Sequence, residues 1–129
     1  FPGLAVMNAD ATDPIVIYEG AGLAMRPNWS PDGELIAFLN CSSDSSSATV
    51  HTVSPNGADL VSLAEGAADC DWWPNSRFSW SPDGQYITFA GDFNRGGELG
   101  EGIYVMDVHS MWRKRLTNAA DGNPAWSPQ

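Results

Sequence analysis

One five-residue motif, Trp-Ser-Pro-Asp-Gly, occurs twice in the chain and begins a third time. The complete copies occupy residues 29–33 and 80–84, and the third starts at residues 126–128. Successive copies are spaced by roughly 50 residues, a period that is typical of repeat architectures. The chain is therefore expected to fold as stacked copies of one small unit.

Each copy of the motif predicts a tight β-turn between two strands. Proline presets the backbone of the second turn position, aspartate can bond neighbouring main-chain N–H groups, and glycine accepts a positive φ. These are structural duties, and we assign them to Asp32, Gly33, Asp83 and Gly84.

Short runs of β-branched, aromatic and aliphatic residues predict strands between these turns. The 13 glycines and nine prolines interrupt the sequence too often for a long helix. Loops are expected at residues 19–26, 40–47, 64–77 and 91–102. The expected strands are residues 3–8, 15–18, 27–29, 34–39, 48–53, 59–63, 78–80, 85–90, 103–107 and 112–117.

This pattern predicts an all-β protein made of β-propeller blades, because each unit of about 40–50 residues holds four short antiparallel strands. We expect a half blade at residues 1–25, blades at 26–76 and 77–123, and the start of another blade at 124–129. About three blades less one strand leave the ring incomplete in one chain. The remaining blades would belong to a longer protein, or several copies would assemble.

The same residues resemble the TolB-type (WD40-like) β-propeller repeat. Residues 27–63 match it more loosely, because Val50-His51-Thr52-Val53 lacks the aromatic of the third strand, and residues 3–18 match the last two strands. The resemblance implies a closed ring, commonly of six or more blades, in a periplasmic or secreted protein. Propellers host many functions, so it says little about the activity. The fullest match is carried by residues 80–84, 87–89, 103–107 and 115–117.

The charge balance excludes two classes of partner. Sixteen acidic residues against six basic ones give a net charge of −10, whereas nucleic acids and anionic membranes require clustered Lys and Arg. The one basic run, at residues 113–115, falls on an expected outer strand, where Lys and Arg guard an exposed edge. No apolar run approaches the ~20 residues of a membrane span. We therefore expect a protein partner or further copies of the chain, with no nucleic acid and no membrane insertion.

Two cysteines, Cys41 and Cys70, fall in loops expected at the same end of the propeller. Their positions permit a disulfide, and two small buried thiols are the alternative. A disulfide requires an oxidising compartment, which agrees with the periplasmic or extracellular location that the resemblance implies.

The loop after Cys70 contains a candidate binding site formed by Asp71, Trp72 and Trp73. Exposed aromatic residues mark interfaces, so the two tryptophans could hold a sugar ring or a side chain of a partner. The alternative is that they cover the gap between two blades.

A second loop is rich in oxygen ligands: Asp92, Asn94, Glu98 and Glu101. Such loops can bind Ca²⁺, but this spacing does not match an EF-hand and Arg95 interrupts it. We expect a solvated loop, with neither a metal nor a cofactor.

No catalytic set is recognisable, because His51 and His109 fall in different units and no Gly-x-Ser-x-Gly motif is present. The sequence therefore predicts a non-enzymatic scaffold for protein–protein interaction or self-assembly. A glycan-binding segment, or the non-catalytic propeller of a peptidase or lyase, is the alternative.

Overall fold

The computed structural model describes residues 3–44, 48–67, 79–92, 101–117 and 125–127. No helix in these ranges is long and apolar enough to cross a membrane. The strands, in chain order, are β1 (Leu4–Val6), β2 (Ile15–Tyr18), β3 (Gly22–Trp29), β4 (Ile36–Ser42), β5 (Ala48–Val53), β6 (Val61–Ala67), β7 (Ser79–Trp80), β8 (Tyr86–Asp92), β9 (Glu101–Asp107) and β10 (Arg113–Arg115).

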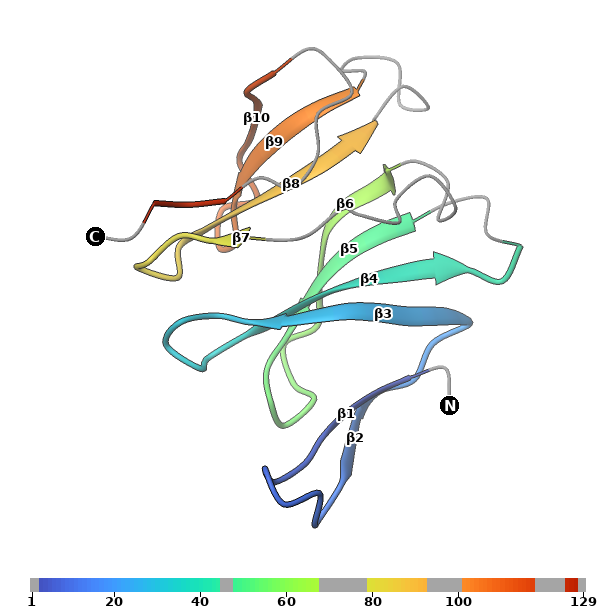
Figure 1. Ribbon diagram of the computed structural model, residues 1–129. Helices are drawn as coiled ribbons and strands as arrows, with labels where there is room; N and C mark the ends of the chain where they lie inside the picture. Colours follow the sequence, from blue (N-terminus) through green and yellow to red (C-terminus); the bar gives the residue numbers. More distant parts are fainter. Residues whose placement is uncertain (1–2, 45–47, 68–78, 93–100, 118–124, 128–129) are drawn as a thin grey trace.

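These strands form three antiparallel sheets stacked face to face (Figure 1). The pair β1–β2 is called the half-blade, the sheet β3-β4-β5-β6 is blade 1, and the sheet of β7 to β10 is blade 2. In both blades the strands lie in the order of the sequence. The predicted all-β propeller architecture is confirmed, and the described sheets form an open stack.

Apolar residues fill the two spaces between the sheets, because alternate side chains of a strand point to opposite faces. Along β4, Ile36 and Phe38 face the half-blade, whereas Ala37 and Leu39 face blade 2. The cluster between blades 1 and 2 contains Ala37, Leu39, Cys41, Ala48, Val50, Leu63, Trp80, Ile87, Phe89, Tyr104, Met106 and Val108. The smaller cluster contains Leu4, Ile17, Ile36, Phe38 and Val53.

The two complete motif copies fold into the same hydrogen-bonded turn. Ser30 Oγ donates to Asp32 Oδ1 at 2.6 Å, and Glu34 N donates to the same oxygen at 3.0 Å. Leu35 N donates back to Ser30 Oγ at 3.0 Å, while Gly33 has a φ of 74°. The serine therefore joins both sides of the turn. In blade 2, Asp83 Oδ1 accepts from Ser81 Oγ at 2.6 Å and from Gln85 N at 3.0 Å. Tyr86 N donates to Ser81 Oγ at 2.9 Å, and Gly84 has a φ of 72°.

All four segments expected to be loops are partly strand, including residues 64–67 of β6, residues 91–92 of β8 and residues 101–102 of β9. The prediction of a loop at residues 19–26 was wrong from Gly22 onward, because β3 pairs with β4 on both sides of a bulge. A bulge between Met25 and Asn28, with Arg26 at a φ of 57°, breaks the alternation by which this strand could have been recognised. The prediction that Cys41 lies in a loop was also wrong, since it is buried in β4 between β3 and β5.

Candidate functional site

The junction between the two complete blades is joined by a tryptophan of the repeated motif. Trp80 in β7 is 8% exposed and belongs to the cluster between blades. Its Nε1 donates a hydrogen bond of 3.1 Å to the main-chain oxygen of Asn28 in β3. Asn28 directly precedes Trp29, the first motif tryptophan, so the bond connects equivalent strands of adjacent blades.

The third motif tryptophan contacts blade 2 through different atoms, because its Nε1 is buried without a hydrogen-bond partner. Trp126 N donates to Ser79 Oγ at 3.0 Å, and its indole stacks on Tyr86 with centroids 6.2 Å apart. Ser79 precedes Trp80 as Asn28 precedes Trp29. Residues 125–127 carry no strand assignment, yet they lie where the first strand of a following blade would begin.

The first motif tryptophan has a different environment. Trp29 is 48% exposed, although it pairs in register with Ile36, a buried residue of the cluster between the half-blade and blade 1. The half-blade consists of two strands, which match the outer pair of a blade. Among the described residues, no equivalent of β3 therefore lies in front of Trp29 to offer it a main-chain oxygen.

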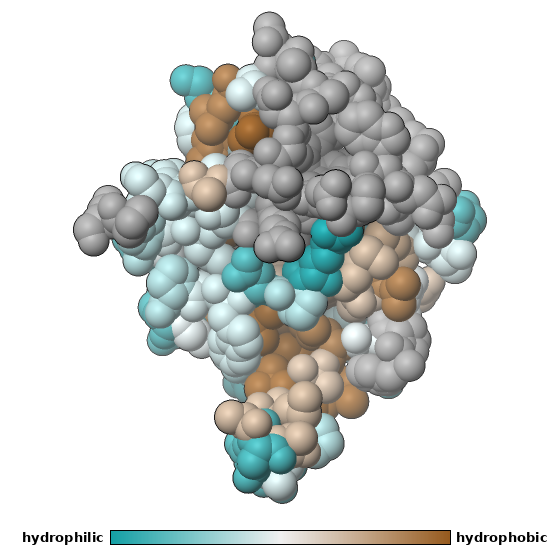
Figure 2. Space-filling view, in the orientation of Figure 1, coloured by the Kyte–Doolittle hydropathy of each residue, from teal (hydrophilic) through white to brown (hydrophobic). Residues whose placement is uncertain are grey.

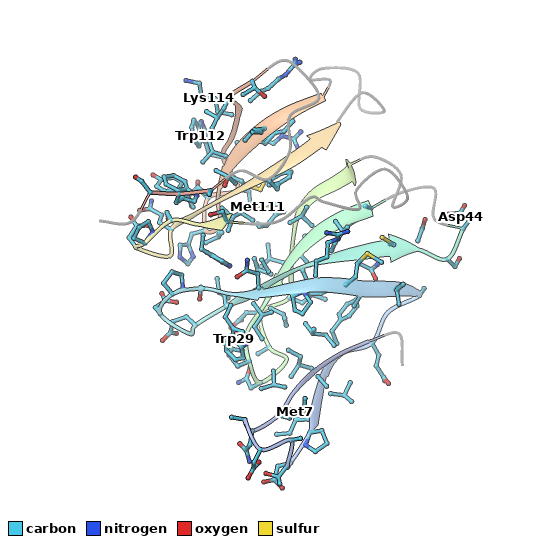
Figure 3. The ribbon with its side chains drawn as sticks, in the orientation of Figure 1. Met7, Trp29, Asp44, Met111, Trp112 and Lys114 are labelled. Atoms are coloured by element: carbon cyan, nitrogen blue, oxygen red, sulfur yellow. The ribbon has the colours of Figure 1, made fainter. Side chains whose placement is uncertain are left out.

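The half-blade, which packs against blade 1, also carries an exposed apolar side chain. Ile15 is 61% exposed, although Ile17, on the same side of β2, is buried against blade 1. Figure 3 shows Trp29 on the side of β3 that faces the half-blade, which carries Met7. Figure 2 shows hydrophobic colour where the half-blade meets blade 1. We call Trp29 and Ile15 the open blade face.

A cavity of about 370 Å³ lies between the turns of blade 1 and blade 2. Asp32, Glu34, Asp59 and His109 contribute its charged or titratable groups, and we call it the inter-blade pocket. The hydrogen bond from the Ser30 hydroxyl, followed by that from Glu34 N, lowers the pKa of Asp32, with a smaller contribution from the charge of His109. Asp32 is therefore ionised at neutral pH.

A buried carboxylate also organises the turn between β9 and β10. Asp107 Oδ1 accepts hydrogen bonds from His109 N at 2.9 Å and Ser110 N at 3.0 Å, while Oδ2 accepts one from Gln85 Nε2 at 3.0 Å. The bond from the Ser110 main chain, with those from Gln85 and His109, lowers the pKa of Asp107 to about 2. All three stabilise the ionised form, so Asp107 has a structural role.

Several candidates from the sequence lie wholly or partly outside the described residues. Cys41 is disulfide-bonded, and the only other cysteine of the chain is Cys70. Within the described ranges, no group of three or more His, Cys, Asp or Glu residues could hold a metal ion. Asp92 and Glu101 are paired in the register of β8 and β9. The candidates outside the description are Cys70, Asp71, Trp72, Trp73, Asn94 and Glu98.

Sequence reasoning missed both surfaces that the structure brings out. The unequal exposure of Trp29 and Trp80 depends on what precedes each blade. The repeat contained the signal for the exposure of Trp29. Only two strands, half of a four-stranded blade, were expected before the strand that holds Trp29. The inter-blade pocket joins Asp59 to residues about 50 positions away in the second blade, which no local pattern reveals.

Comparison with protein families gives a match over residues 3–129 to the model of the TolB beta propeller domain. Among solved structures, TolB from Acinetobacter baumannii superposes with a TM-score of 0.65 at 23% identity, covering 91% of this chain and 28% of that one. A search of curated proteins finds no match.

Two further structures share the fold. An oligogalacturonate lyase in complex with manganese gives a TM-score of 0.63 at 16% identity over 88% of this chain and 28% of its own. The β-propeller domain of the Trilobed protease from Pyrococcus furiosus is described as having an open velcro topology. It superposes with a TM-score of 0.57 at 16% identity, covering 87% of this chain and 33% of that one. The chain thus spans about a third or less of each of these relatives.

Proposed function

The chain belongs to the TolB β-propeller domain family, and on that premise we propose that it is a non-enzymatic scaffold for self-assembly. Its open blade face binds the edge of a blade from another copy. The observation that carries this proposal is the contrast between two equivalent tryptophans. Trp80 is buried and bonded to the preceding blade, whereas Trp29 is half exposed.

The internal junction indicates what the open blade face would bind. Trp80 Nε1 bonds the oxygen of the residue before the preceding motif tryptophan, Asn28. The corresponding residue before the third motif tryptophan is Ala125, which is exposed. In the proposed contact, Trp29 Nε1 of one copy donates to the main-chain oxygen of Ala125 in the next copy.

Such a contact is head-to-tail, because it joins different surfaces of the two copies. Interfaces of this kind close into a ring when the rotation between subunits permits it. Closure would cover the apolar surface at Trp29 and Ile15.

The remaining features of the proposal are the absence of catalysis and a periplasmic or extracellular location. The disulfide at Cys41 supports the location, because disulfides persist in oxidising compartments. The net charge of −10 supports a protein partner in preference to nucleic acid or a membrane surface. Glycan binding at Trp72 and Trp73 stays a prediction.

Sedimentation velocity tests the proposal over a range of protein concentrations. The wild-type chain is expected to associate as its concentration rises, and Trp29→Ser is expected to abolish association. Trp112→Ser is the matched control, since Trp112 is 53% exposed on the turn before β10 and lies outside the open blade face. A wild-type chain that stays monomeric throughout, or equal effects of the two substitutions, would contradict the proposal.

A further inference from the structure

The inter-blade pocket combines an excess of negative charge with a buried hydroxyl. Asp32, Glu34 and Asp59 provide three carboxylates against the single imidazole of His109. Thr52 also lines the cavity; it is only 1% exposed, and its Oγ1 has no hydrogen-bond partner. A buried hydroxyl that makes no hydrogen bond is unfavourable, so an acceptor or donor from a ligand would stabilise it.

The orientation of Thr52 follows from the register of β5. Thr52 pairs with Ala37 and lies two residues after Val50, and both of these neighbours belong to the cluster facing blade 2. Thr52 therefore points toward the space between the blades, where the cavity lies. The pocket thus has a polar group at its inner wall and carboxylates from the surrounding turns.

The arrangement of these groups selects against a metal ion. The carboxylates and His109 do not form a group of three that could hold a metal, as is true throughout the described residues. A cavity of about 370 Å³ is instead of the size that accepts a small organic group. Separated acceptors suit a ligand that presents several donors in different directions.

The apolar part of the lining adds a second requirement. Leu35, Val61 and Val108 contribute to the same cavity, and Leu35 and Val61 pack against the cluster between the blades. A cation on a methylene stem would place its charge near the carboxylates and its stem against these side chains. Guanidinium has five N–H donors in a planar fork, whereas ammonium is a compact point charge.

We infer that the inter-blade pocket binds a guanidinium group carried on an apolar stem, with Glu34, Asp32 and Asp59 facing the cation and Thr52 Oγ1 accepting one of its hydrogen bonds. The lowered pKa of Asp32 keeps that carboxylate charged. The guanidinium can come from an arginine side chain of a protein or from a free arginine-like molecule. This inference is independent of the proposed self-assembly.

The test is a titration of the whole chain followed by the shifts of its backbone amide NMR signals. N-acetylarginine amide is expected to bind saturably and to shift the amides of Thr52, Asp59 and His109. N-acetylcitrulline amide, which has the same shape without the charge, is expected to leave them unchanged. The lysine compound acetylated on its α-amine, which keeps a charged ammonium on its side chain, should bind at least about threefold more weakly, because it lacks the planar fork.

Two pairs of variants connect the binding to the pocket. Glu34→Gln is expected to weaken binding about three- to tenfold, whereas Glu19→Gln, which removes an exposed charge before β3, should not change it. Thr52→Val is expected to weaken binding by a similar factor. Its control is Thr49→Val, a substitution on the opposite face of β5. Far-ultraviolet circular dichroism checks that each variant is folded.

The remaining outcomes distinguish the two sources of the guanidinium group and define what would overturn the inference. Stronger binding of N-acetylarginine amide than of free arginine supports a protein arginine as the source, and the reverse supports a free amino acid; both keep the guanidinium site. The inference is overturned by absence of saturable binding, by equal binding of the citrulline or lysine compound, or by equal effects within either pair of variants.

Discussion

Trp80 Nε1 in blade 2 donates a 3.1 Å hydrogen bond to the main-chain oxygen of Asn28 in blade 1. Trp80 is also part of the apolar cluster between the two blades. The motif that identifies the repeat in the sequence is therefore also part of the contact between neighbouring repeats. The consequences of this arrangement can be measured on single substitutions.

Replacing Trp80 with phenylalanine keeps an aromatic ring but removes the N–H donor. Trp80→Phe is expected to lower the free energy of unfolding by about 2 kcal/mol, through the lost bond to Asn28 and incomplete filling of the site. Urea denaturation measures the change. Trp112→Phe, at an exposed position, should change stability by no more than about 0.5 kcal/mol; equal losses would contradict the inter-blade role of Trp80.

The turn glycines form a matched pair for a second prediction. Gly33 and Gly84 both have a positive φ, but an added Cβ meets nothing within 4 Å at Gly33 and lies 3.0 Å from Asp32 Oδ2 at Gly84. Gly33→Ala should cost about 1–2 kcal/mol from backbone strain alone. Gly84→Ala should cost at least about 0.5 kcal/mol more, because the Asp32 carboxylate must move. Thermal or urea unfolding of both variants makes the comparison, and a smaller loss at Gly84 would be inconsistent with the contact.

The pH dependence of stability provides a third prediction. The folded-state pKa of Asp107 is about 2, below its ordinary value of 3.8, so its ionised form favours folding. This contribution is complete above about pH 4 and is lost as the pH falls toward 2. Asp107→Asn should lower stability at pH 7 by about 1–3 kcal/mol, and the difference from wild type should shrink between pH 4 and 2 in urea denaturation. A difference that stays constant with pH would refute this role.

The disulfide bond of Cys41 gives a fourth prediction. Cys41 is disulfide-bonded and buried, with its sulfur 3.7 Å from that of Met25. We expect a non-reduced digest to yield one linked peptide pair containing Cys41 and Cys70, by mass spectrometry. Reduction should lower the free energy of unfolding by about 2–4 kcal/mol. Ready alkylation of Cys41 without prior reduction would contradict the bond.

The architecture could be predicted from the sequence because its strongest signals are local. Trp-Ser-Pro-Asp-Gly specifies the turn through the conformations of proline and glycine, and the apolar runs after it specify the strands. The same local reasoning failed at Gly22–Arg26 and at Cys41. There, pairing with neighbouring strands decides the structure, although glycine and asparagine individually disfavour strands.

The candidate surfaces were harder to predict, because both depend on which blades are neighbours. Trp29 and Trp80 occupy equivalent positions in the sequence, and only the three-dimensional stack shows that one is exposed. Likewise, Thr52 resembles any other strand threonine until its register places it on the wall of the inter-blade pocket.

The head-to-tail contact between copies can be tested by mixing two variants that cannot assemble alone. Trp29→Ser removes the proposed donor but leaves Ala125, while Ala125→Glu obstructs the acceptor end but leaves Trp29. Each variant is expected to sediment as a monomer, and an equimolar mixture is expected to form a 1:1 dimer through the one intact interface. A mixture that sediments as monomers, while the wild-type chain associates, would contradict the proposed contact between Trp29 and the Ala125 end of the next copy.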